Sequence, residues 1–332
     1  MNHRALSLLS GGLDSILATK LMLEQGIEVE AINFVTTFCT CTRKGCQSAA
    51  RAVAEKFKIP LKIVGLQEEY LKIVRNPKHG YGANMNPCLD CRVMIFTKAK
   101  EHMKDIGASF IFTGEVLGER PMSQRRDAMM LIEKESGLKG LILRPLSAKH
   151  FEPTAPEIAG IVDRNRLLDI KGRSRKPQIA LAESFGINDY PCPAGGCLLT
   201  DKGFANRMRD LIKHDNLTMD ETRLLKIGRH FRLSNKVKLV IGRDEEENGA
   251  LEKMFRDGDI ILQVRDFPSP FAVLRGEGAA GLLQDAAGII ASHTKAKDAR
   301  SCHVNFWIFP GGDKREADVT PANRDRIDGL RI

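Results

Sequence analysis

Apolar runs and amphipathic runs alternate along the first two hundred residues of the chain. The short apolar runs predict buried strands at 4–9, 28–35, 61–66, 108–113 and 140–144. Between and after them, apolar positions recur at helical spacing and predict helices at 13–25, 46–58, 91–106, 155–165 and 176–186. This alternation predicts an α/β fold, a doubly wound parallel sheet with helices on both faces. Because ligands bind at the carboxyl ends of such strands, the loops at 10–15, 33–46 and 113–127 should carry the site.

The pattern changes after the first two hundred residues. The segment "KHDNLTMDETRLLKIGR" at 213–229 is polar and helix-like, and short alternating strands with one central helix at 281–293 follow it. We therefore predict a first domain at 1–212, a linker at 213–229 and a smaller α+β domain at 230–332.

The loop "SGGLDS" at 10–15 turns the first predicted strand into the first predicted helix. Peptide N–H groups and the helix dipole favour an anion at such a position. Gly11 and Gly12 allow the backbone to approach a ligand closely. The loop therefore predicts a phosphate site. The alternative is an ordinary turn in which Ser or Asp caps the helix.

Cysteine spacing indicates a second kind of chemistry. Cys88 and Cys91 form a C-x2-C at the start of a predicted helix, where thiolate is favoured, and Cys192 and Cys197 lie in a Pro/Gly loop. Three of these thiols would suit a 4Fe–4S cluster with one open iron, and four would suit zinc. A redox disulfide or a purely structural role remains open for the C-x2-C. Cys39, Cys41 and Cys46 are either structural thiols or a partial metal site.

The formal charge of +9 permits a polyanionic partner. Two basic segments are candidates for phosphate contact, with the solvated surface as the alternative: Arg120, Arg125 and Arg126 in one, and Arg173, Arg175 and Lys176 in the other. The scattered His79, His150 and His214 are predicted to be surface residues. Since the chain has no apolar run of membrane-spanning length and no room for a signal peptide before the first strand, we expect a cytoplasmic protein without membrane contact.

Three segments together resemble the catalytic domain of the tRNA 4-thiouridine synthetases: "SGGLDS", "TGEVLGERPMSQ" and "LRPLS". The segment "NPCLDCRVMIF" is similar to the cysteine motif of the tRNA 2-thiouridylases. Both families are PP-loop ATP pyrophosphatases, and the resemblance over about 4–200 implies an adenine nucleotide alpha hydrolase-like fold.

The same resemblance implies roles for individual residues. It assigns the pyrophosphate to Ser10, Gly11, Gly12, Asp14 and Ser15, with Asp14 also catalytic. It assigns the adenosine to Phe34 and Gly114, and makes Cys88, Cys91 and Cys197 sulfur-handling thiols or 4Fe–4S ligands, with Cys192 as the rival third ligand.

The residues after 230 resemble a different family. The segments "KLVIGRDEEENGALEKM", "GDIILQVRDFPSPFAVLRG" and "AAGIIASHTKAKDARSCHVNFWIF" look like the RNA-binding domain of the NFACT proteins. This resemblance implies RNA contact through Lys295, Lys297 and Arg300, with Arg243 and Arg265 as further candidates.

These observations predict an ATP-dependent tRNA sulfurtransferase that adenylates a uridine oxygen and replaces it with sulfur. It would need ATP, Mg²⁺, tRNA and a sulfur donor, either sulfide or a persulfide carrier. The alternatives are a small-molecule ATP pyrophosphatase of the amidating type and a non-catalytic RNA-binding factor. The sequence leaves open which uridine reacts and whether the chain forms a homodimer.

Overall fold

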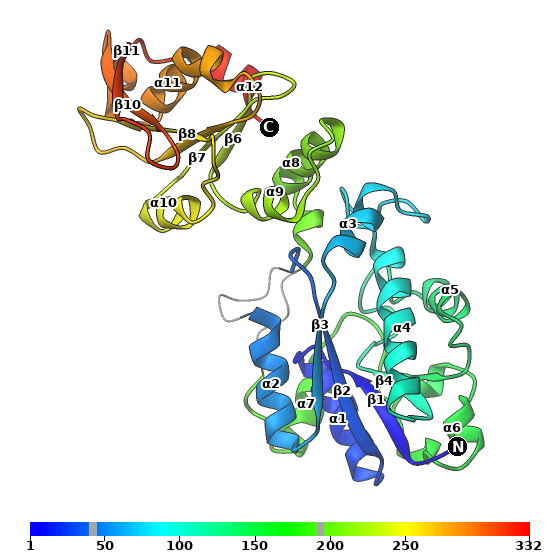
Figure 1. Cartoon of the computed structure of the whole chain (residues 1–332). Helices are drawn as coiled ribbons and strands as arrows, with labels where there is room; N and C mark the ends of the chain where they lie inside the picture. Colours follow the sequence, from blue (N-terminus) through cyan, green and yellow to red (C-terminus); the bar gives the residue numbers. More distant parts are fainter. Residues whose placement is uncertain (40–44, 191–195) are drawn as a thin grey trace. The chain divides into compact units, whose positions relative to one another are not determined.

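The computed structural model describes residues 1–39, 45–190 and 196–332. These residues form two compact units, Met1–Thr200 and Asp201–Ile332 (Figure 1).

The first unit is built on a five-stranded sheet in the order β3-β2-β1-β4-β5, in which every neighbouring pair is parallel. Its strands are β1 (Arg4–Leu8), β2 (Glu28–Val35), β3 (Leu61–Gly65), β4 (Phe110–Thr113) and β5 (Ile142–Leu143). Its helices are α1 (Leu13–Glu24), α2 (Gly45–Phe57), α3 (Glu68–Arg75), α4 (Cys88–Asp105), α5 (Arg126–Ser136), α6 (Ala155–Ile158) and α7 (Lys176–Ser184).

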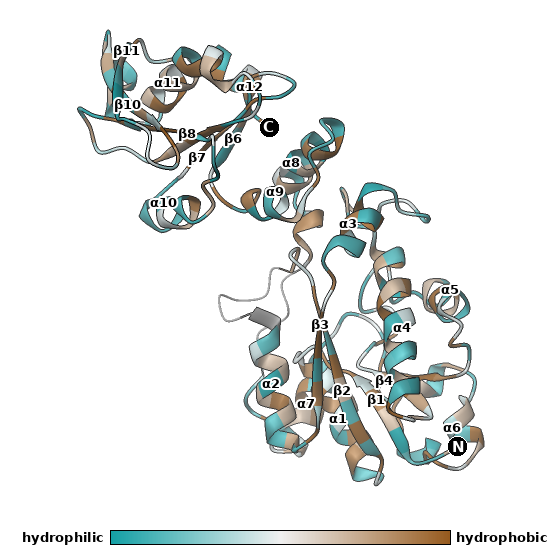
Figure 2. Cartoon of the chain, in the orientation of Figure 1, coloured by the Kyte–Doolittle hydropathy of each residue, from teal (hydrophilic) through white to brown (hydrophobic). Residues whose placement is uncertain are grey.

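Helices cover both faces of this sheet because successive side chains of a strand point to opposite faces. Ala5 of β1 packs in one apolar cluster with Leu17 of α1, and Leu6 packs in another with Phe96 of α4. Figure 2 shows apolar and polar stretches alternating along α4, as expected of a helix with one buried side. The predicted doubly wound α/β fold is confirmed.

Several element boundaries differ from the predicted ones; for example, the helix predicted at 91–106 begins at Cys88. The helix predicted at 155–165 ends at Ile158, because Gly160 adopts a left-handed conformation with φ +69°. The strand predicted at 140–144 contains only Ile142 and Leu143. Helices α3 and α5 were absent from the prediction.

The second unit holds a six-stranded antiparallel sheet in the order β11-β10-β8-β9-β7-β6. Its strands are β6 (Arg229–Arg232), β7 (Lys238–Ile241), β8 (Ile260–Val264), β9 (Ala272–Arg275), β10 (Cys302–Ile308) and β11 (Arg315–Val319). Its helices are α8 (Lys202–Lys213), α9 (Met219–Leu224), α10 (Glu245–Glu252), α11 (Leu283–Ser292) and α12 (Arg324–Leu330). A smaller α+β domain was predicted here, and the separate antiparallel sheet confirms it.

Helix α11 supplies much of the core of this unit. Ile289 and Ile290 are fully buried in one cluster with Leu262 of β8 and Leu274 of β9. Helices α8 and α9 occupy most of the segment 201–229 and fall within this unit. Of the helices in the described ranges, none has the length and apolar character needed to cross a membrane.

Lys238 on β7 is a buried cation whose replacement should stabilise this unit. Its side chain is 4% exposed, and its Nζ has no hydrogen-bond partner among the described residues. Burial lowers the pKa of Lys238 from 10.5 to about 8, although Glu221 and Asp210 oppose the shift. Below pH 8 the lysine is charged in the folded and unfolded chain alike, so the folded chain carries the full cost of desolvation.

We therefore expect Lys238→Met to raise the free energy of unfolding at pH 7 by about 1–3 kcal/mol. Between pH 8 and 10.5 the unfolded chain binds more protons than the folded one, so wild-type stability rises with pH there, and the variant should lose this rise. Denaturant unfolding at pH 7 and 9.5 measures both effects. Lys236→Met, at an exposed lysine paired with Glu277, is the matched control. A Lys238→Met protein less stable than wild type at pH 7 contradicts the expectation.

Candidate functional site

A cavity of about 320 Å³ opens where β1 and β4 end side by side. The strand order reverses at this point, since β1 leads to β2 on one side and pairs with β4 on the other. Ligands of open α/β sheets bind in such a crevice. The cavity is lined by Leu8, Ser10, Gly12, Leu13, Asp14, Ser15, Cys88, Arg92, Thr113, Gly114, Glu115, Glu119, Arg120, Ser123, Gln124 and Arg175.

The loop between β1 and α1 presents its backbone to this cavity. Gly12 is the N-cap of α1 and no side chain caps the helix, so the alternative of an ordinary capped turn does not hold. The Ser15 hydroxyl instead donates to the carbonyl of Gly12 at 2.8 Å, and the Ser10 hydroxyl donates to the Ser15 hydroxyl oxygen at 3.2 Å. The first-turn N–H groups of α1 are therefore open to an anion.

Two glycines of the site lie where no side chain fits. Gly11 has φ +79°, and a Cβ on it would lie 2.7 Å from Cβ of Ala49 and N of Ala50 on α2. A Cβ on Gly114, directly after β4, would lie 2.4 Å from the backbone of Asp14 and Ser15. The end of β4 thus rests on the first turn of α1, which fixes the shape of the cavity.

Asp14 is one of the acidic residues that line the cavity. Burial raises the pKa of Asp14, partly offset by the charge of Arg175 and by Gln178. Its Oδ1 is buried without a hydrogen-bond partner among the described residues. Glu119 faces it, and burial together with the Asp14 charge raises the pKa of Glu119. An unpartnered carboxylate oxygen beside a second carboxyl suits Mg²⁺ carried on a triphosphate.

A buried ion network forms the wall of the cavity near α4. Arg92 pairs with Glu115, and Arg144 Nε donates to the other oxygen of Glu115 at 3.1 Å. Arg144 also pairs with Glu133 of α5. Burial alone would raise the pKa of Glu115, but Arg92 and Arg144 more than offset it and the pKa is lowered. The network keeps the Arg92 guanidinium charged and fixed beside Cys88.

Long-range backbone pairing brings Cys197 toward the cysteines of α4. Cys197 forms an isolated antiparallel bridge with Cys39, and Leu198 N donates to Phe38 O at 2.8 Å. Met85 N donates to Leu199 O at 3.0 Å, which ties the segment to the loop before α4. All three thiols, Cys88, Cys91 and Cys197, are partly buried. Cys88 and Cys91 lie close enough to raise the pKa of Cys197 electrostatically.

The thiols near α4 are less acidic than their helix position suggests. Burial raises the pKa of Cys91 to about 11, and the hydrogen bond from Tyr70 and the charge of Arg92 offset this only in part. Burial also raises the pKa of Cys197 to about 12. The expectation that the helix N-terminus favours thiolate is therefore wrong for Cys91 without a bound metal, because desolvation outweighs the helix dipole.

His79 is not the surface residue that the sequence predicts. Its Nδ1 lies 3.1 Å from Asp90, and its Nε2 lies 3.2 Å from Glu135 of α5. Its backbone N also donates to Asp90 at 3.0 Å. Because Asp90 lies between the two cysteines of the C-x2-C, these bonds fix the first turn of α4.

The other predicted site residues are divided between the cavity and the surface. Arg120 and Arg175 line the cavity, whereas Arg173 and Lys176 are exposed outside it. Arg126 donates to the carbonyl of His150. Lys295 and Lys297 are exposed on a 3-10 helix (Lys295–Asp298) of the second unit.

Some predicted positions do not lie at the cavity. Phe34 does not line it and packs instead in the core cluster on the α4 face of the sheet, with Leu6 and Phe96. Cys41 and Cys192 lie outside the described residues, and Cys46 belongs to α2. Within the described parts of the chain, no three His, Cys, Asp or Glu side chains converge closely enough for a single metal ion.

The sequence did not single out several residues of the cavity. Arg92, Thr113 and Gln124 line it, and so does the buried Glu115. Gln178 of α7 is fully buried and lowers the pKa of Asp14, although no hydrogen bond of normal geometry joins the two side chains. Arg92 was accessible to sequence reasoning through its place after Cys91, but Gln178 carried no such signal.

Comparison with known families gives a match for each unit. Residues 1–158 match the family described as thiamine biosynthesis protein (ThiI). Residues 228–330 match the NFACT protein RNA binding domain.

Relatives and solved structures give more distant similarities. The chain is 23% identical to tRNA-specific 2-thiouridylase MnmA of Methylobacillus flagellatus, over 99% of this chain and 89% of that protein. It is 34% identical over 121 residues to MnmA of Syntrophotalea carbinolica, an alignment that spans 34% of each chain, about a third of that relative's length. A structure of U34-tRNA thiolase NcsA from Methanococcus maripaludis with its 4Fe–4S cluster is 18% identical, with a TM-score of 0.34, over 67% of this chain and 69% of that one.

Proposed function

Because the first unit belongs to the PP-loop ATP pyrophosphatases of the tRNA-thiolation type and the second is an NFACT-type RNA-binding domain, we propose that the chain is an ATP-dependent tRNA sulfurtransferase. The observation that carries the proposal is the cavity itself. Cys88 lines the same space as the Ser10–Ser15 loop, so a thiol and a phosphate-binding loop face one ligand.

ATP would bind with its phosphates against the loop. The open N–H groups of α1 suit the pyrophosphate, and Arg120 and Arg175 supply positive charge to it. Asp14 would hold Mg²⁺, which offsets charge on the triphosphate. The adenosine would lie beside Gly114, which lines the cavity.

In the first step a uridine carbonyl oxygen attacks the α-phosphorus as the base loses its N3 proton. A bond forms between this oxygen and phosphorus, and the bond to the β-phosphate breaks, so pyrophosphate leaves. Arg92 stabilises the charge that develops, since its guanidinium lines the cavity and is held by Glu115. The uridine must be unstacked to reach the cavity.

In the second step hydrosulfide adds to the activated ring carbon, and the carbon–oxygen bond breaks with release of AMP. This exchange is redox-neutral. If the sulfur came instead from a persulfide on Cys197, a second thiol would release the product. The resulting disulfide would then require a thiol reductant.

The thiols Cys88, Cys91 and Cys197 fit a 4Fe–4S cluster as a donor set. They are soft sulfur ligands from two segments that backbone pairing brings together. A bound cluster would supply an open iron for exogenous sulfide. Cys192 is the alternative third ligand.

RNA would be held by both units. In the first, a basic segment runs beside the cavity: Arg175 lines the cavity, and Arg173 and Lys176 are exposed next to it in the sequence. In the second, Lys295 and Lys297 are exposed and suit phosphate contact.

The test measures pyrophosphate release and thionucleoside formation with unmodified tRNA, ATP and sulfide, under anaerobic conditions. We expect both products to depend on RNA, and Cys88→Ser to reduce thionucleoside to background while ATP still binds. Cys302→Ser, at a buried cysteine of the second unit, is the matched control. Pyrophosphate release that is independent of RNA would support a small-molecule ligase, and its complete absence would support a non-catalytic factor.

A further inference from the structure

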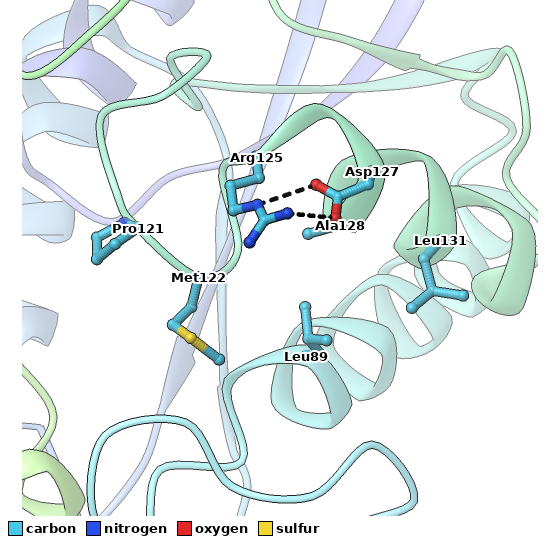
Figure 3. Close-up of a pocket in the computed structure, with 7 residues that line it drawn as sticks. All are labelled: Leu89, Pro121, Met122, Arg125, Asp127, Ala128 and Leu131. Atoms are coloured by element: carbon cyan, nitrogen blue, oxygen red, sulfur yellow. Dashed lines mark hydrogen bonds and ion pairs between the residues drawn. The ribbon is translucent and has the colours of Figure 1, made fainter.

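A second pocket of about 360 Å³, called here the Met122 pocket, lies beside the cavity proposed to bind ATP, called the nucleotide cavity (Figure 3). Its apolar wall is formed by Leu89 of α4, by Pro121 and Met122 of the loop before α5, and by Ala128 and Leu131 of α5. Arg125 and Asp127 form a charged pair at the same pocket. Its volume lies within the range of about 300–1,000 Å³ typical of small-ligand sites.

The Met122 pocket shares its walls with the nucleotide cavity. Along one loop, Arg120, Ser123 and Gln124 line the cavity, whereas Pro121, Met122 and Arg125 line the pocket. The first turn of α4 also borders both spaces, because Cys88 lines the cavity and Leu89 lines the pocket. A ligand in the pocket would therefore be separated from the cavity by one thickness of backbone.

The lining of the pocket suits a flat, apolar ring with a polar edge. Leu89, Met122 and Leu131 offer apolar contact, and a methionine thioether packs favourably on aromatic rings. Arg125 bonds Asp127 through Nε at 3.2 Å and Nη2 at 2.9 Å. Both side chains are exposed, so the pair is weak and can open to give a ring edge one donor and one acceptor.

The charge around the pocket favours RNA over an apolar peptide. Arg120, Arg125 and Arg126 fall within seven residues of one another and are all exposed. Such a set suits the phosphates of a polyanion. Single-stranded RNA also presents unstacked bases, which proteins bind in pockets beside the chain.

We propose that the Met122 pocket binds the base of an unpaired RNA nucleotide neighbouring the one that enters the nucleotide cavity. This inference rests on the proposed function, since it takes the substrate of the cavity to be RNA. It assigns the pocket a positioning role. Holding the neighbouring base keeps the reacting uridine out of its stack and directed at the cavity.

The experiment uses the full chain with p-benzoylphenylalanine in place of Met122, and with Met122→Ala and Met122→Glu. The probes are unfractionated bacterial tRNA, a 12-nucleotide oligouridine and an RNA duplex. Met122 is 36% exposed, so these variants should fold. Met130→Glu is the matched control, because Met130 is 40% exposed on α5 and does not line the pocket.

We expect illumination to crosslink position 122 to tRNA and to oligouridine but not to the duplex. Met122→Ala should weaken oligouridine binding several-fold and Met122→Glu by about 10-fold or more, with ATP affinity unchanged and Met130→Glu like wild type. Equal binding by the Met122 and Met130 variants, or crosslinks to protein alone, would overturn the inference.

The two proposals fail in different ways. A chain that crosslinks to oligouridine from position 122 but makes no thionucleoside would refute the sulfurtransferase and retain the RNA pocket. A chain that makes thionucleoside without any crosslink from position 122 would support the sulfurtransferase and refute the RNA pocket.

Discussion

Replacing Arg144 with methionine is expected to lower the free energy of unfolding of the first unit by about 3–5 kcal/mol at pH 7. Arg144 is 3% exposed and pairs with both Glu115 and Glu133. Methionine fills much of the volume but leaves two buried carboxylates, of which only Glu115 keeps a cation, Arg92. Breaking a buried pair from one side costs more than the pair contributes, because the remaining charge stays desolvated.

The pH dependence of stability distinguishes this cause from simple loss of packing. The pKa of Glu115 lies below its ordinary value of 4.5 in the folded protein, so its contribution is present above pH 4.5 and lost as pH falls through the lowered pKa. In Arg144→Met this acid-side loss should be smaller, since Arg92 alone opposes the burial of Glu115. Denaturant unfolding between pH 3 and 7 measures it.

The control for this variant is an exposed pair of the second unit. Arg324→Met removes a pair with Asp328 in which both side chains are largely exposed, and it should change stability by less than about 0.5 kcal/mol. If Arg144→Met were as stable as wild type at pH 7, the buried network would not be holding the wall of the cavity.

Replacing Gly114 with alanine is expected to abolish ATP binding and to destabilise the first unit by about 1–3 kcal/mol. The added Cβ would lie 2.4 Å from the carbonyl carbon of Asp14 and the nitrogen of Ser15. Both atoms are backbone, so neither can rotate away, and the end of β4 must separate from the start of α1. That movement displaces the loop that receives the phosphates.

Calorimetric ATP titration and denaturant unfolding check the two effects. Gly249→Ala is the matched control, because Gly249 lies in helix α10 with nothing within 4 Å of an added Cβ. It should leave ATP binding unchanged and raise the helix propensity of α10. An alanine at 114 that binds ATP as tightly as glycine would show that the cavity is not the nucleotide site.

The sequence predicts a site where all of the residues that form it are neighbours in the chain. The loop "SGGLDS" predicts an anion site because its glycines, its hydroxyls and the following helix are neighbours in the chain. The C-x2-C is of the same kind, since Cys88 and Cys91 fall on one helical turn. The alternating strands and helices likewise determine a parallel sheet with two covered faces.

Features assembled across the chain were decided by the tertiary structure. Arg92, Glu115 and Arg144 come from three separate segments of the chain, and their charges become a network only because packing brings them together. Burial also reverses a local prediction at Cys91, where desolvation outweighs the helix dipole and raises the pKa of the thiol.

The sequence by itself therefore determined the α/β and α+β folds, the phosphate-type loop and the candidate cysteines. The tertiary structure alone decided which of them meet: Cys88 lines the same cavity as the loop, Gln178 lies close enough to affect Asp14, and Phe34 packs against the core instead of lining the cavity. The physical reason is that local hydrogen bonding and hydrophobic periodicity, which determine helices, strands and turns, involve residues close together in the chain. Burial and charge act between segments whose meeting depends on the packing of the whole unit.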